Sequence, residues 1–128
     1  ALAAADAGAR AMDDIAEGGT ALALRELSQA SGLGIELEYD RMPWSAEGVL
    51  VAREYGADPL STSSFGSLLI AAPQDHVEEV LKALREQGRP SEEVGHFQNG
   101  KDIFVKKSGK KSKLEIREDI YGRFTPKL

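Results

Sequence analysis

Residues 65–87 read FGSLLIAAPQDHVEEVLKALREQ, and this stretch decides the fold class. Its first part, residues 65–72, is a nearly continuous apolar run that Pro73 closes. Such a run predicts the most buried strand of the protein, covered on both faces. Between Asp75 and Gln87, apolar residues recur at helical spacing, namely at Val77, Val80, Leu81 and Leu84. Charged residues fill the opposite face, so this part predicts an amphipathic helix packed on the sheet.

Upstream of this stretch the sequence pattern predicts three helices and a strand. The alanine-rich residues 1–10 have high helix propensity. A leucine-rich series predicts a second helix over residues 19–32, which ends at a glycine. Residues 35–39 alternate apolar and acidic side chains, which predicts a strand with one solvent-exposed face. A serine that can cap a helix begins the third helix, which is predicted over residues 45–55.

Downstream of the stretch, short strands alternate with turns. Residues 94–97 and 103–105 are predicted strands, and Asn99-Gly100 between them is a dipeptide that favours a tight hairpin. The remaining expected elements are a turn at 108–110, a strand at 114–116 and a short helix within 118–123. This order of helices and strands predicts helices packed on a sheet, in the α+β or α/β class.

Length and composition predict one domain over residues 1–128, with 41% hydrophobic and 29% charged residues. The absence of cysteine excludes disulfides, thiolate metal sites and thiol catalysis within this chain. No apolar run approaches the roughly 20 residues of a membrane span, and no secretory leader is recognisable, so we expect a cytoplasmic protein without membrane contact. The chain begins at Ala1 as though inside a helix, which suggests a piece of a longer protein.

Charge is unevenly distributed along the chain. Residues 1–100 hold 17 acidic and 7 basic residues, whereas residues 101–128 hold 4 acidic and 9 basic residues. The basic end has two interpretations: a surface that binds nucleic acid or anionic lipid, or a lysine-rich β-hairpin with a solvated tip. The hairpin is favoured because lysines protect edge strands from pairing with other chains. Nucleic-acid binding would use Lys106, Lys107, Lys110, Lys111 and Lys113, and Phe104 is the only aromatic residue of that stretch.

Two segments carry residues suited to phosphate chemistry. Asp13, Asp14 and Glu17 precede the paired glycines Gly18 and Gly19 at the expected start of a helix. Glycines admit a ligand close to the backbone, free amides at a helix start suit phosphate, and carboxylates can hold Mg²⁺ that bridges phosphates. The alternative is a structural loop whose acidic residues complement the helix dipole.

The second segment is hydroxyl-rich. Residues 61–66 read STSSFG, and they can either bind phosphate or form a turn capped by their own hydroxyls. His76 and His96 have no metal-ligand spacing, and neither is expected to be catalytic. The chain contains no Walker loop, dinucleotide fingerprint, nucleophile elbow or zinc spacing.

Several motifs resemble one known family. Residues 11–19, AMDDIAEGG, resemble the A-M-x-D-x-[T/S]-E-G-G signature of the aminoimidazole ribonucleotide (AIR) synthetase-like superfamily. Residues 30–37, ASGLGIEL, are similar to its A-S-G-V-G-I-E-I passage, and residues 58–71 are similar to its D-P-L and S-S-G-x-L-L-I-A motifs. The matches keep the family's order over about residues 1–100 and cover its C-terminal domain. The branch they resemble most contains the AIR synthase-related and hydrogenase-maturation (carbamoyl dehydratase) proteins.

The resemblance implies an α+β fold with α/β/α layers and a mixed sheet, partly ferredoxin-like. It also implies that a separate N-terminal domain carries most of the ATP site and forms a homodimer, so that this domain alone is inactive. Family enzymes use ATP with Mg²⁺ to activate an amide oxygen or to transfer a phosphate. The ligand-facing residues would be Asp14, which would also bind the metal, Glu17, Gly18 and Gly19, joined by Ser63, Ser64 and Gly66.

Two departures leave the function open. Ala16 stands where the family usually has threonine or serine, and the chain ends at Leu128 without the cysteine that hydrogenase-maturation members use as a carrier. The resemblance therefore favours an AIR synthase-related protein of unknown substrate. The alternative is a non-catalytic assembly or regulatory module that keeps the fold without the site.

Overall fold

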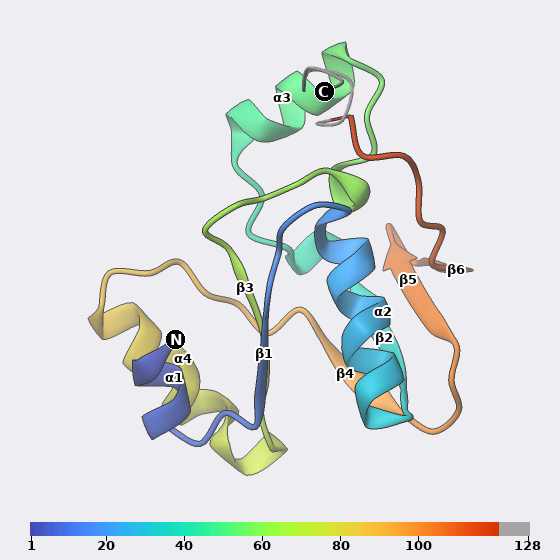
Figure 1. Cartoon of the computed structure of the whole chain (residues 1–128). Coiled ribbons are helices and arrows are strands. Elements are labelled where there is room, and N and C mark those ends of the chain that lie inside the picture. The colour runs from blue at the N-terminus through green and yellow to red at the C-terminus, as the bar shows by residue number, and fades with distance from the viewer. Residues whose placement is uncertain (121–128) are drawn as a thin grey trace, which may run out of the picture.

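The computed structural model describes residues 1–120, so the end of the helix expected within 118–123 lies outside the described residues. The helices are α1 (Leu2–Asp6), α2 (Gly19–Ser31), α3 (Ala46–Glu54) and α4 (Val77–Glu86), with 3₁₀ turns η1 (Tyr39–Arg41), η2 (Pro59–Ser61) and η3 (Gln74–His76). The strands are β1 (Ala11–Asp14), β2 (Gly34–Glu38), β3 (Leu68–Ala71), β4 (Gly95–Gln98), β5 (Ile103–Lys107) and β6 (Lys110–Lys113). Figure 1 shows their arrangement.

The core lies between α2 and the larger sheet. Its buried residues are Ala21, Leu24, Ile35, Leu37, Leu60 and Val105. Leu37 on β2 is only 1% exposed, which places this strand at the centre of the packing. The helix ends as the sequence predicts: Gly32 takes a left-handed backbone conformation, and the Ser28 hydroxyl donates to the Leu33 carbonyl oxygen at 2.6 Å. The predicted helix over residues 19–32 and the strand after it are confirmed.

The larger sheet has the order β4-β2-β5-β6 and is mixed. Strand β2 is antiparallel to β4 and parallel to β5, and β5 is antiparallel to β6. The hairpin expected at Asn99-Gly100 is therefore wrong, because β2 lies between the two strands that this loop joins. A strand as buried as β2 must have hydrogen-bonding partners along both edges, which β4 and β5 provide.

The prediction that residues 65–72 form the most buried strand is also wrong. Strand β3 covers only the second half of the apolar run and pairs with β1 in a separate two-stranded sheet. Leu68 is 40% exposed, and Phe65 is 63% exposed and lies outside the strand. The apolar composition predicts a central strand that is covered on both faces. Within the described residues, β3 instead has a partner, β1, along one edge. Residues 11–14, for which the sequence pattern predicts no strand, supply that partner as β1.

Helix α4 packs beside α1, as Figure 1 shows at the left of the view, whereas the sequence predicts that it packs on the sheet. Val80 and Leu81 are buried, whereas Val77 and Leu84 are half-buried. The apolar stripe thus forms the expected amphipathic helix but covers a different partner. Together with the mixed sheet, these helices confirm the α+β class.

The lysine-rich hairpin is confirmed. Strands β5 and β6 are joined by Ser108-Gly109, both with positive φ (49° and 77°), the backbone conformation of a tight two-residue hairpin. Every residue of β6 is exposed, and this strand ends at Lys113, before the strand expected at 114–116 begins. No helix within residues 1–120 has the length and apolar character to cross a membrane.

Candidate functional site

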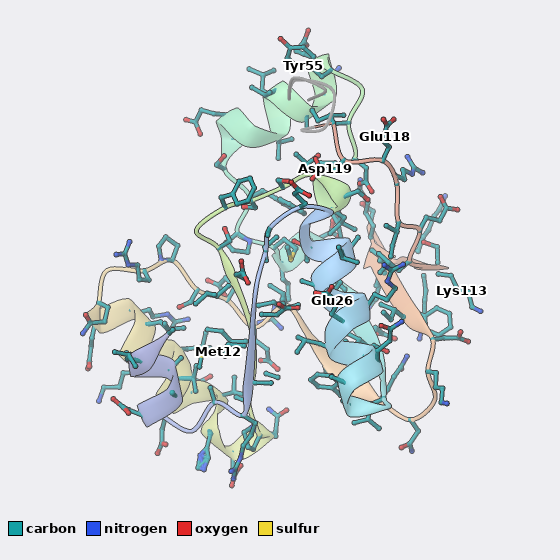
Figure 2. All side chains as sticks on the ribbon, in the orientation of Figure 1. Met12, Glu26, Tyr55, Lys113, Glu118 and Asp119 are labelled. Carbon is teal, nitrogen blue, oxygen red and sulfur yellow. The ribbon has the colours of Figure 1, made fainter. Side chains whose placement is uncertain are left out.

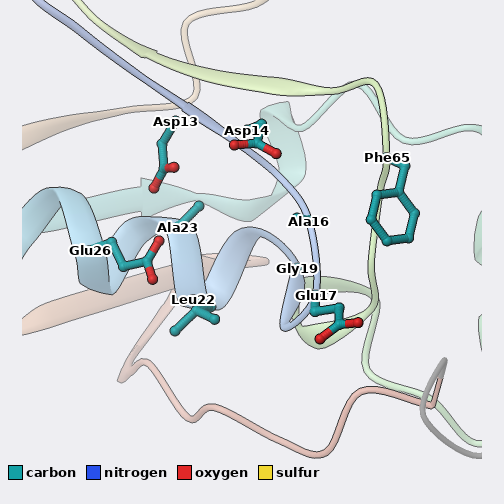
Figure 3. A pocket seen from close by; sticks show the side chains of 9 residues that line it. All are labelled: Asp13, Asp14, Ala16, Glu17, Gly19, Leu22, Ala23, Glu26 and Phe65. Carbon is teal, nitrogen blue, oxygen red and sulfur yellow. The ribbon is translucent and has the colours of Figure 1, made fainter.

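A pocket of about 350 Å³ opens where β1 ends and α2 begins. Its acidic lining residues are Asp13, Asp14, Glu17 and Glu26, and its other lining residues are Ala16, Gly19, Leu22, Ala23 and Phe65. Figure 3 shows Asp13 and Asp14 on the strand side, Glu26 on the helix, and Glu17 towards the end where Phe65 lies. We call this the acidic pocket. Among residues 1–120 its lining carries four carboxylates and no basic side chain, so it suits a cation or a ligand whose charge a cation has offset.

The acidic pocket does not form a complete metal site by itself. Within residues 1–120, no group of three or more histidine, aspartate or glutamate side chains is placed to hold one ion. Mg²⁺ commonly keeps several waters and binds through one or two carboxylates plus substrate phosphates. Asp14 is exposed at the pocket edge, so it can serve as such a ligand only together with oxygens from elsewhere.

The paired glycines have a structural explanation of their own. Gly18 (φ 84°) is the N-cap of α2, and Gly19 (φ 64°) is its first residue. A Cβ on Gly19 would lie 2.5 Å from the carbonyl oxygens of Leu60 and Thr62. The start of α2 is therefore in close contact with the backbone of the hydroxyl-rich segment. This contact joins the two segments that the sequence singles out for phosphate chemistry.

A second feature lies at the same end of α2. One carboxylate oxygen of Asp119 accepts hydrogen bonds from the backbone N–H of Gly18 (2.9 Å), the backbone N–H of Ser63 (3.1 Å) and the Ser63 hydroxyl. We call these three donor groups the anion cradle. Figure 2 places Asp119 beside the start of α2. The positive end of the helix dipole favours a negative group at this position.

The predicted site residues thus fall into three groups. Asp14, Glu17 and Gly19 line the acidic pocket, while Gly18 and Ser63 form the anion cradle. Ser64 and Gly66 belong to neither: the Ser64 and Ser67 hydroxyls share a hydrogen bond at 2.9 Å, and Gly66 takes a positive φ in the turn before β3. Their contact with a ligand stays a prediction.

Sequence reasoning missed several residues of these two features. Glu26 lies on the same face of α2 as Leu22 and Ala23, two turns from Gly19, and that spacing was a usable signal. Phe65 was assigned to a buried strand, which concealed its place at the pocket mouth. Asp119 lies 101 residues from Gly18 and 56 from Ser63, and no local pattern could connect them.

Comparison with known proteins gives a consistent result. The family described as AIR synthase related protein, C-terminal domain, matches residues 1–108. The chain is 34% identical over 88 residues to a putative hydrogenase expression/formation protein of Methanocaldococcus jannaschii, covering 67% of this chain and 26% of that protein. It is 35% identical over 82 residues to the carbamoyl dehydratase HypE of Rhodobacter capsulatus, covering 64% of this chain and 24% of that protein.

Solved structures agree with the relatives. Escherichia coli HypE, a hydrogenase maturation protein, superposes with a TM-score of 0.81 at 27% identity, covering 87% of this chain and 36% of that one. A HypE structure in complex with ATP superposes with a TM-score of 0.80 at 20% identity, covering 87% and 36%, and that likeness shows the fold alone. The chain spans about a quarter of the length of the curated relatives it matches. By its sequence motifs, its fold and these matches, the chain belongs to the AIR synthase related family, in which it represents the C-terminal domain.

Proposed function

We propose that this chain supplies one wall of a cleft that binds ATP with Mg²⁺ or a phosphorylated substrate. The observation that carries the proposal is the anion cradle, in which Gly18 and Ser63 already hold a negatively charged oxygen at the start of α2. Backbone N–H groups at a helix N-terminus and a nearby hydroxyl are the donors that a phosphate oxygen uses in proteins. ATP is the nucleotide to test, because a HypE with the same fold has been solved in complex with ATP.

The donor set fits a phosphate better than it fits a free metal ion. The cradle would hold a phosphate oxygen, and the carboxylates of Asp14 and Glu17 would face the same ligand from the acidic pocket. Bound Mg²⁺ would offset repulsion between those carboxylates and the phosphates. Because the described lining residues include no basic side chain, we propose that most of the nucleotide contacts come from another domain. From the family resemblance we also expect the chain to act with its own N-terminal ATP-binding domain in a homodimer, which we expect to be cytoplasmic, and to lack turnover alone.

Substitution of Asp14 in the full-length protein tests this function. Asp14→Asn keeps the size of the side chain and removes its charge, so Mg²⁺–ATP should bind more weakly and ATP-dependent activity should fall about 10²-fold or more. Asp75→Asn, an exposed substitution in η3 away from the pocket, is the matched control. Equal affinity and equal turnover in wild type and Asp14→Asn would contradict the assignment.

A second candidate function is a non-catalytic assembly or regulatory module. The observation in its favour is Ala16, whose methyl group lines the acidic pocket where the family usually carries a hydroxyl. The same titration separates the two functions. A full-length protein that folds and dimerises but shows no Mg²⁺–ATP binding would support the assembly module.

A further inference from the structure

The anion cradle is occupied by the chain's own C-terminal segment. Asp119 comes from the stretch after β6, which reaches the start of α2, as the hydrogen bond from the Gly18 N–H and Figure 2 show. Its carboxylate accepts hydrogen bonds from both backbone N–H groups of the cradle and from the Ser63 hydroxyl. Hydrogen bonds to an ionised acceptor are about twice as strong as neutral ones, so the contact between Asp119 and the cradle is a strong one.

Contacts on both sides of Asp119 hold the segment in place. On one side, the backbone N–H of Arg117 donates to the Ser61 hydroxyl oxygen at 3.0 Å, and that hydroxyl donates to Asp58 at 2.9 Å. On the other side, Ile120 is buried, with 8% of its surface exposed. The carboxylate is thus presented to the cradle from two anchors. We call residues 117–120 the latch.

A carboxylate and a phosphate cannot both use the same N–H groups of Gly18 and Ser63. An intramolecular group competes at the high effective concentration that its tether imposes. We propose that the latch is autoinhibitory, with Asp119 standing in for the phosphate oxygen of the ligand and leaving the cradle when that ligand binds. This inference rests on the proposed function, since it assumes that the cradle takes phosphate.

The latch has a measurable consequence for affinity. A binding-competent state that is only fractionally populated weakens the apparent affinity by that fraction. A latch closed for nine-tenths of the time therefore weakens phosphate binding about tenfold. Removing the charge of Asp119 should recover that factor, because a neutral amide competes poorly with a phosphate for the same donors.

The test is a titration of the whole chain with inorganic phosphate at constant ionic strength, followed through the amide NMR signals of Gly18 and Ser63. The variant is Asp119→Asn. The matched control is Glu115→Gln, which removes the same charge from the same C-terminal stretch and, among the described residues, breaks an exposed ion pair with Arg117. We expect phosphate to bind Asp119→Asn about tenfold more tightly than the wild type or the control.

Each other result overturns the latch in a distinguishable way. Equal binding by wild type and Asp119→Asn would leave the phosphate cradle standing and remove the autoinhibition. If Asp119→Asn and Glu115→Gln tightened phosphate binding equally, the cause would be the loss of a negative charge from the segment and not the release of the cradle. If phosphate moved neither amide signal in any variant, Asp119 would be a structural clasp, and the cradle assumed by the proposed function would fail with it.

A measurement on the wild type covers the case in which Asp119→Asn folds poorly. When the latch lifts, the Arg117 amide loses its acceptor on Ser61. Saturating phosphate should therefore accelerate hydrogen exchange at Arg117 several-fold, while exchange at the buried Leu37 amide stays unchanged. Unchanged exchange at Arg117 under saturating phosphate would show that the ligand binds without displacing the latch.

Discussion

Gly19 is the residue at which fold and candidate site meet. Its φ of 64° is unfavourable for any residue with a Cβ, and the Cβ would lie 2.5 Å from two backbone carbonyl oxygens. Gly32, at the other end of α2, has a similar φ of 71° with nothing within 4 Å of its Cβ position. Gly19 and Gly32 therefore allow the cost of the left-handed backbone conformation to be measured apart from the cost of close packing.

Alanine substitution at both glycines tests this explanation. Gly32→Ala should cost about 1–2 kcal/mol of unfolding free energy, the cost of a left-handed conformation. Gly19→Ala should cost about 1–3 kcal/mol more, because the backbone of residues 60–62 must move as well. Denaturant melts of the two variants measure the difference. Equal losses would mean that the close approach of α2 to η2 carries no energy.

At the residue scale, the sequence singles out residues that the structure brings close together, but it does not give their geometry. The acidic residues and paired glycines were identified because their types suit phosphate chemistry. Their division between a pocket and a cradle was not predictable, since it depends on the contact of Gly19 with residues 60–62 and on Asp119. Both are long-range contacts, which local spacing does not encode.

Strand β2 explains why individual elements were predicted better than their pairing. Its alternating pattern was recognised, but its place between β4 and β5 was not. The hairpin signal at Asn99-Gly100 is local, whereas the need of a buried strand for two partners is a property of the whole sheet. The same limit applied to β3, whose apolar composition gave no sign that its partner would be the polar strand β1.

Lys111 connects β6 to β2 across the intervening strand. Its ammonium group lies 4.6 Å from the centre of the Phe104 ring on β5 and donates a hydrogen bond to the Glu36 carboxylate on β2. This hydrogen bond, with the positive charges of Lys111, His96 and Lys106 nearby, lowers the pKa of Glu36 below its ordinary value despite the opposing effect of burial. One exposed side chain thus ties the edge of the sheet to its centre.

The lowered pKa of Glu36 predicts how stability depends on pH. A carboxylate whose pKa is depressed by folding adds stability that is present above its unfolded pKa of about 4.3 and is lost as the pH falls through the folded value. Lys111→Gln should raise the pKa of Glu36 towards its ordinary value and weaken the loss of stability on acidification. NMR titration of the Glu36 carboxyl carbon measures the shift.

Lys110→Gln is the control for that experiment, because Lys110 lies on the same strand and makes no ion pair within residues 1–120. It removes the same charge and should leave the pKa of Glu36 close to the wild-type value. A shift of similar size in both variants would replace the specific hydrogen bond with a general effect of the lysine cluster.

At the scale of the whole molecule, part of the uneven charge is neutralised by ion pairs between the described lysines and carboxylates. The basic hairpin lies beside the acidic side chains of β2 and the loops near it. Its ion pairs are Lys106 with Glu38 at 3.1 Å, Lys113 with Asp102 at 2.9 Å, and Lys111 with Glu36. Lys107 lies 4.1 Å from the centre of the Tyr39 ring. Within the part of the chain that the structure describes, three of the hairpin's five lysines are therefore paired with carboxylates, which reduces the positive charge available to an external partner.

This arrangement predicts that the chain does not bind nucleic acid. Affinity for DNA comes mainly from cations that neutralise phosphates and release counterions, and it weakens steeply as salt increases. A cation already paired with a carboxylate must break that pair before it can neutralise a phosphate, and the net charge of −5 opposes approach. We expect no binding of mixed-sequence DNA or RNA even at about 50 mM salt, measured by fluorescence anisotropy. Binding at that salt, weakened at about 200 mM and abolished by Lys110→Gln with Lys111→Gln, would instead make the hairpin a nucleic-acid surface.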